Sequence, residues 1–83
     1  MEFAKSMSGH DRNQYYLIQK KDEEFAYLVN GVTKPLSKPK KKNLKHIQII
    51  KKLPQEVLQI LETEQTDIAI KKAIKVYEQM LQS

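Results

Sequence analysis

Lysines gather in one segment of this chain, and their spacing suits one kind of chemistry, the binding of phosphate groups. Residues 34–46 hold six of the fourteen lysines, two of the three prolines and no acidic residue. The six are Lys34, Lys38, Lys40, Lys41, Lys42 and Lys45. Proline fixes part of the backbone, which lowers the entropy lost when ammonium groups are held against phosphates. Arg12 is the lone arginine, so bidentate reading of base edges is limited and we expect affinity to exceed sequence specificity.

Residues for other kinds of chemistry are scarce. His10 and His46 lie in polar, charged contexts, and no serine, threonine or cysteine stands in a nucleophile motif. The acidic run at residues 22–24 is typical of a charged turn, and two glycines are too few for a phosphate cradle. With no cysteine there is neither a disulfide framework nor a thiolate metal site. We therefore expect no catalysis, no metal and no cofactor.

The charge is distributed unevenly. Residues 1–33 carry four basic and five acidic side chains, residues 34–52 carry eight basic and none acidic, and residues 53–83 carry three basic and five acidic. The net charge of +5 thus comes from one segment, which indicates a polyanionic partner. Two other interpretations stay open for this segment: a mobile, solvated loop, and a targeting or membrane-surface patch.

Short strands are predicted over the first fifty residues. The candidate ranges are 3–7, 14–20, 25–29, 32–36 and 46–50. Asn30-Gly31 favours a tight hairpin between the third and fourth of these, which would leave the lysine-rich segment as a loop anchored at both ends. Ile47 and Ile49 would share one face, with Ile50 on the other. Residues 15–18 are apolar on both faces, which suggests that the outer face of the sheet is also covered.

Two helices are available to cover it. Pro54 suits a helix start, and Val57, Ile60 and Leu61 follow at helical spacing. Thr66 is a good N-cap for a second helix, with Asp67 in its first turn. Its predicted apolar stripe consists of Ile70, Ala73, Ile74, Tyr77 and Leu81. The pattern predicts one α+β domain over residues 1–83, a small barrel of about five strands at 1–50 followed by a helical extension at 54–81 that packs on it.

Four aromatic residues could serve either the core or a ligand. They are Tyr15, Tyr16, Phe25 and Tyr27. If they lie outward they could stack on unpaired bases. Core packing is the alternative use.

The order of short motifs resembles that of bacterial KOW-domain RNA-binding proteins, which are related to a large-subunit ribosomal protein family of archaea and eukaryotes. Ser8-Gly-His-Asp-Arg-Asn13 before the strand at 15–18 is similar to the glycine-containing turn of the KOW motif. The similarity continues through Tyr27-Leu-Val-Asn-Gly31, Lys34 and Leu36, and Pro39-Lys-Lys-Lys-Asn43 with Lys45-His46, and then through Thr66-Asp67, Lys72-Ala73 and Tyr77.

This resemblance implies an SH3-like barrel of KOW type that binds structured RNA such as ribosomal RNA. By position, Gly9, His10, Asp11 and Arg12 would form a turn beside the RNA. Lys40, Lys41, Lys42, Asn43, Lys45 and His46 would form the basic loop. Asn13 stands where the motif has glycine, and asparagine tolerates left-handed backbone better than most residues, so the turn can survive.

These expectations describe a cytoplasmic, monomeric, ribosome-associated RNA-binding protein without catalysis or membrane contact. The resemblance also implies ribosomal proteins as partners. The alternative is a protein-interaction adaptor that uses the barrel or the last helix.

Overall fold

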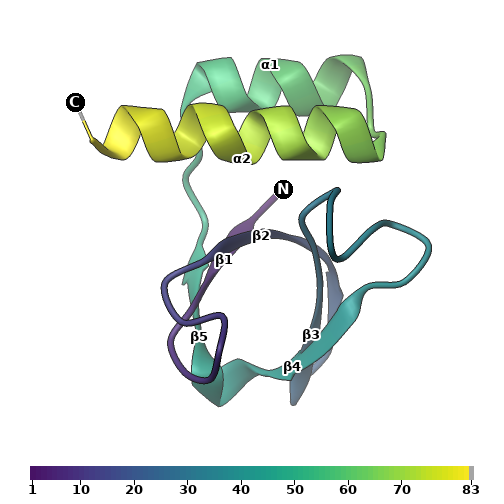
Figure 1. The fold of residues 1–83 in the computed structure, drawn as a ribbon, viewed down its shortest axis with the longest axis vertical. Helices are drawn as coiled ribbons and strands as arrows, with labels where there is room; N and C mark the ends of the chain where they lie inside the picture. The colour runs from purple at the N-terminus through teal and green to yellow at the C-terminus, as the bar shows by residue number, and fades with distance from the viewer. Residues whose placement is uncertain (83) are drawn as a thin grey trace.

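The computed structural model describes residues 1–82 as five strands followed by two helices (Figure 1). The strands are β1 (Phe3–Ser6), β2 (Tyr15–Lys21), β3 (Phe25–Val29), β4 (Lys40–Asn43) and β5 (Ile47–Ile50). A short 3-10 helix, η1 (Leu44–His46), joins the last two strands. The helices are α1 (Gln55–Thr63) and α2 (Asp67–Leu81). The predicted α+β class, with strands first and helices last, is confirmed.

The strands form one antiparallel sheet in the order β4-β3-β2-β1-β5. The sheet is strongly curved, and both helices lie together on one side of it (Figure 1). Its edge strands β4 and β5 are joined through the three residues of η1. The two ends of an open sheet therefore lie near each other in the chain.

Both faces of the sheet are covered, as the apolar pattern of residues 15–18 suggested. On the helix side, Phe3 and Val29 are fully buried against α1 and α2, and Tyr15, Leu17 and Ile50 pack beside them. On the other side, a second cluster is formed by Ala4, Tyr16, Ala26, Leu28 and Ile47, with Ile18 and Ile49 beside it. The predicted separation of Ile47 and Ile49 from Ile50 is confirmed.

The cap and the apolar stripe predicted for the second helix are present in α2, with one exception. The Thr66 side chain accepts a hydrogen bond from the Ala69 N–H (3.2 Å), and Asp67 occupies the first turn of α2. Ile70, Ala73 and Ile74 are buried. Leu81 is 52 % exposed, so its place in the buried stripe was wrong. The C-terminal end of α2 runs past α1 (Figure 1), which leaves its last turn without cover.

The predicted hairpin with a strand at 32–36 is wrong. Residues 30–39 form a series of bends and turns, and the partner of β3 is β4, so Lys40–Asn43 are a strand and not a loop. Gly31 has the expected positive φ of 77°, but Asn30 does not share it. Instead, the Asn30 side-chain oxygen accepts hydrogen bonds from the N–H groups of Val32 and Lys34 (both 2.9 Å). That arrangement closes a wider turn than a two-residue hairpin loop.

Candidate nucleic-acid interface

Strand β4 divides the central lysines between two faces of the sheet. Side chains alternate along a strand, so Lys40 and Lys42 share one face and Lys41 points to the other. The Lys41 ammonium lies 4.2 Å from the centre of the Phe25 ring, a cation–π contact. Lys40 and Lys42 both reach Asp11. The three consecutive lysines therefore have different surroundings.

Asp11 is the centre of a buried polar cluster. Its Oδ2 accepts hydrogen bonds from Lys40 Nζ and the Tyr16 hydroxyl (both 2.8 Å), and its Oδ1 accepts them from Lys42 Nζ and the Ser6 hydroxyl (both 2.9 Å). Burial raises the pKa of Asp11, but these four donors lower it by more, so the pKa lies well below its usual range. The carboxylate is charged at neutral pH and fully partnered.

The cluster ties the turn before β2 to strand β4. Lys42 Nζ also donates to the Ser8 carbonyl (2.8 Å), and only 10 % of its side chain is exposed. Burial and the hydrogen bond to Asp11 raise the pKa of Tyr16 well above its usual value, which keeps the hydroxyl a donor. Residues far apart in the sequence are thus fixed together by charge-assisted hydrogen bonds.

The turn has the backbone geometry that its sequence predicted. Gly9 and Asn13 both have positive φ, at 86° and 73°. Asn13 donates its N–H to the Ser6 carbonyl (2.7 Å), which closes the turn onto the end of β1. Gly9, His10, Arg12 and Asn13 are exposed, whereas Asp11 is turned inward.

The remaining predicted site residues lie around β4. Lys38, Lys41, Lys45 and His46 are exposed, and Lys34 is half-buried. Asn43 caps η1, because its side-chain oxygen accepts the Lys45 N–H (2.9 Å). Asn43 therefore holds the backbone before β5 in position.

Most of the lysines in the basic segment have no acidic partner. Within residues 1–82, ion pairs of the eight basic side chains of residues 34–52 are formed by Lys40 and Lys42 alone, both to Asp11. Six lysines remain unpaired. They are Lys34, Lys38, Lys41, Lys45, Lys51 and Lys52. The charge left over therefore lies within one segment of the sequence and is not neutralised by an acidic side chain.

The residues that organise this region were missed by reasoning from the sequence. Ser6 was not among the predicted site residues, Tyr16 entered only as a ring that could stack on bases or pack in the core, and Asp11 entered only as part of the turn. A signal existed: Asp11 is an acid in the turn, and Lys40 and Lys42 have the period-2 spacing of one strand face. The signal was hidden because residues 40–43 lack the apolar side chains that identify strands.

The four aromatic residues have different environments. Tyr16 is buried, and Tyr15 packs edge-on against Tyr77, with ring centres 5.4 Å apart. Phe25 and Tyr27 are half-buried and carry lysine ammonium groups on their rings, Lys20 lying 4.7 Å from the centre of Tyr27. None of the four rings is fully exposed.

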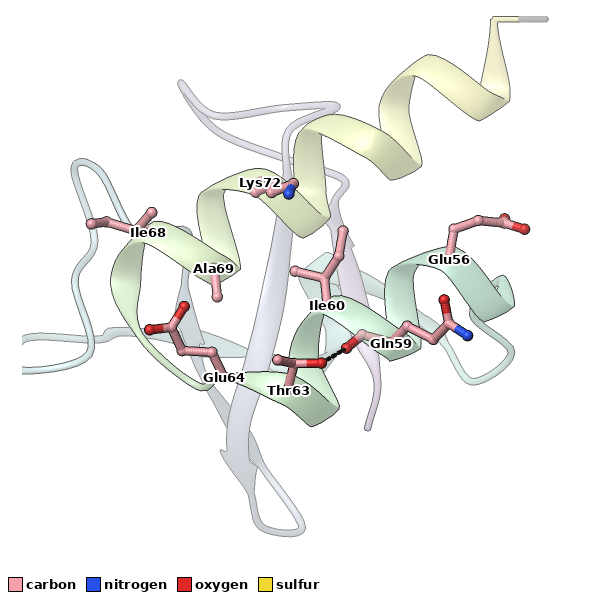
Figure 2. Close-up of a pocket in the computed structure, with 8 residues that line it drawn as sticks. All are labelled: Glu56, Gln59, Ile60, Thr63, Glu64, Ile68, Ala69 and Lys72. Atoms are coloured by element: carbon pink, nitrogen blue, oxygen red, sulfur yellow. Dashed lines mark hydrogen bonds between the residues drawn. The ribbon is translucent and has the colours of Figure 1, made fainter.

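A groove of about 430 Å³ lies between the two helices (Figure 2). Ile60 and Ile68 line it, and Ile68 is 80 % exposed. Glu56 and Glu64 stand at its edges (Figure 2). Among residues 1–82, no group of three or more histidine, cysteine or acidic side chains could hold a metal ion.

In comparisons with known proteins, no protein-family model and no curated protein matches this chain. The KOW-type assignment accordingly stays a prediction. As for membranes, neither helix in the described part of the chain has the length and apolar character needed to cross a bilayer.

Proposed function

We propose that this protein is a non-catalytic RNA-binding protein of the cytoplasm, associated with ribosomal RNA and ribosomal proteins. It binds phosphates through the exposed lysines of residues 34–52 and through the turn Gly9–Asn13. The observation that carries the proposal is the excess of six unpaired lysines on a segment without acidic residues. Such a surface attracts a polyanion and lowers its affinity for neutral or cationic partners.

The different contacts of the lysines on β4 support this proposal. Lys40 and Lys42 neutralise Asp11 and hold the strand against the turn, whereas the other lysines are left for phosphates. A fixed backbone lowers the entropy lost when RNA binds. Lysine supplies point charges that suit phosphate contacts more than base reading, so structured RNA is bound by shape and charge.

An SH3-like barrel of KOW type is the form we propose for the sheet. The two edge strands are joined by η1, and the hydrogen bond from the Met7 N–H to the His46 carbonyl (2.8 Å) extends the pairing of β1 with β5 up to η1. The Asp11 cluster connects β4 to the turn on the same side. The short η1 connection and the Asp11 cluster hold β4 close to the end of the sheet that contains β1 and β5, which favours a closed barrel.

The test replaces three exposed lysines and compares the product with a variant of equal charge. The triple substitution Lys38→Gln, Lys41→Gln and Lys45→Gln lowers the net charge from +5 to +2. The control, Gln55→Glu, Gln59→Glu and Gln65→Glu, reaches the same +2 at exposed positions, two of them in α1 and one just after it. Binding of a structured RNA hairpin is measured by fluorescence anisotropy over a range of salt concentrations.

Six phosphate contacts predict a slope of log K against log salt of about −4 to −5 for the natural chain. The lysine variant should reduce its magnitude by about 2 to 3, with an unchanged circular dichroism spectrum. The control variant should retain most of the slope of log K against log salt. If both variants lost the same RNA affinity, binding would depend on the net charge of the protein and not on the lysines of residues 34–52. Full affinity in the lysine variant would defeat the proposal.

The groove of Figure 2 favours a second candidate function, that of a protein-interaction adaptor. Ile68 is the most exposed of the large apolar side chains described, and the carboxylates of Glu56 and Glu64, which line the same groove, suit a basic partner. Size-exclusion chromatography with light scattering at two concentrations tests whether the groove binds a second copy. A dimer that Ile68→Ser abolishes would favour the adaptor, and a monomer at both concentrations would count against self-association through this groove.

A further inference from the structure

A second pocket is lined by residues that neighbour, in the sequence, the two segments assigned to RNA. It has a volume of about 510 Å³ and lies between the start of β2, the loop after β3 and one flank of α2. Gln14, which lines it, directly follows Asn13 of the turn. Val32, which also lines it, is two residues before Lys34, where the basic segment begins. RNA bound at either segment would therefore lie near this pocket.

The wall formed by the loop is fixed in place. The loop rises toward α2 (Figure 1), and Gly31 packs so closely on the first turn of the helix that a Cβ would overlap the Asp67 carbonyl oxygen. The Asp67 carboxylate accepts a hydrogen bond from the Leu36 N–H (2.8 Å). Within the loop, the Asn30 side-chain oxygen accepts hydrogen bonds from the N–H groups of Val32 and Lys34. The pocket is therefore formed before any ligand arrives, which reduces the entropy lost on binding.

The chemistry of the pocket suits a ligand with a negative charge and an aromatic ring. Lys71 and Lys75 lie one turn apart on α2, both exposed and, within residues 1–82, without an ion pair. Tyr15 presents a half-buried ring, held by its edge-on contact with Tyr77 and approached by the Lys5 ammonium at 5.9 Å. Glu78 and Gln14 add hydrogen-bonding groups at the edges.

We propose that this pocket binds one unpaired nucleotide of the RNA, with Lys71 and Lys75 on its phosphates and Tyr15 against its base. The inference rests on the proposed function, since it names the kind of RNA that the same protein prefers. A nucleotide fits because the volume lies within the usual range of small-ligand sites. A base has a π-face for the tyrosine, and its exocyclic amine or the ribose hydroxyl can donate to the Glu78 carboxylate.

The experiment compares two RNA hairpins that differ by one bulged nucleotide, 2-aminopurine, whose fluorescence reports stacking. The protein variants are Lys71→Gln with Lys75→Gln, and Val32→Glu, which adds a carboxylate at the mouth of the pocket. Val32 is 59 % exposed, so the change leaves the core intact. The matched control is Lys72→Gln, an exposed lysine on the other flank of α2 that lines the groove of Figure 2.

The natural chain should bind the bulged hairpin more tightly than the paired one, by about fivefold or more if one base stacks. The double lysine variant and Val32→Glu should lose this preference and the change in fluorescence, while still binding the paired hairpin in a salt-dependent way. Lys72→Gln should behave like the natural chain. Equal affinity of the natural chain for both hairpins, or a preference that survives in both pocket variants, overturns the inference but leaves the proposed function standing. Absence of binding to either hairpin defeats both.

Discussion

At the scale of single residues, three adjacent lysines show how position on a strand decides the role of a charge. Lys41 lies over Phe25, whereas Lys40 and Lys42 are used to neutralise Asp11. Lys42 is the most enclosed of the three, with 10 % of its side chain exposed against 31 % for Lys40. Its replacement would change the fold as well as the charge, so a binding test that included Lys42 would confuse the two.

Asp11→Asn should destabilise the protein and alter its response to acid. The change leaves two ammonium groups without a counter-charge, at a cost on the order of 2 to 3 kcal/mol after allowing for the partial exposure of Lys40. The melting temperature should fall by about 10 °C or more. Because the pKa of Asp11 is lowered in the folded state, its contribution is present above the unfolded pKa of about 4 and is lost as the pH falls below it.

Urea unfolding of the natural chain and the variant between about pH 7 and about pH 2 measures this difference. The gap in unfolding free energy should be widest near neutral pH and narrow in acid. Glu23→Gln, at an exposed position of the β2–β3 turn, is the control and should show little effect. A gap that stayed constant with pH would mean that Asp11 is not held charged by the cluster.

At the scale of elements, the loop after β3 is the part whose form depends most on its neighbour. Asn30-Gly31 could make a tight hairpin locally, yet Gly31 packs instead against the backbone of Asp67 and Lys71 at the start of α2. The Asp67 carboxylate, which the sequence placed in the first turn of the helix, also accepts the Leu36 N–H. One acidic residue thus serves both the helix dipole and the loop.

Gly31→Ala and Gly9→Ala should differ in cost, although both positions have positive φ. At Gly9 a Cβ would meet its nearest neighbours at 3.7 and 3.8 Å, so only the backbone strain of about 1 kcal/mol remains. At Gly31 the Cβ would overlap the Asp67 carbonyl oxygen, and the loop must move off α2, at a cost of about 3 kcal/mol or more. Thermal melts of both variants measure the ratio, and equal losses would contradict the packing of the loop on the helix.

At the scale of the whole molecule, the helices complete a core that the sheet cannot bury alone. Phe3 and Val29 are fully buried on the helix side, together with Val57, Leu61 and Ile70 from the helices. The helical part is also acidic, with five acidic and three basic side chains in residues 53–83. The same two helices therefore stabilise the sheet and separate the charge of the molecule into a basic and an acidic part.

A chain ending at residue 52 should fail to fold on its own. Loss of the helices would expose Phe3 and Val29, each of which gains about 2 kcal/mol from burial, and would uncover the apolar side chains beside them. We expect a nuclear magnetic resonance spectrum without dispersed amide signals. Leu81→Ser in the full chain is the control, and it should leave the melting temperature nearly unchanged because Leu81 is 52 % exposed. A well-dispersed spectrum of the shortened chain would show that the sheet is an independent unit.

The sequence by itself determined the features that depend on neighbouring residues. The strands at Tyr15–Lys21 and Phe25–Val29, the cap at Thr66 and the positive φ at Asn13 all follow from local pattern and backbone preference. The size and location of the basic charge were also fixed, because charge is a sum over residues. These are the parts of the fold and of the candidate site that could be predicted.

Only the tertiary structure decided which of those charges remain available. Lys40 and Lys42 find Asp11 across 29 and 31 residues of chain, and no local pattern encodes a contact at that separation. The strand at β4 was missed for the same reason, since its lysines are held by pairing with β3 and not by their own apolar character. The pocket beside α2 likewise exists only because distant segments meet. The net charge follows from the composition alone. The direction in which each charged side chain points, and the group that it contacts, depend on the fold.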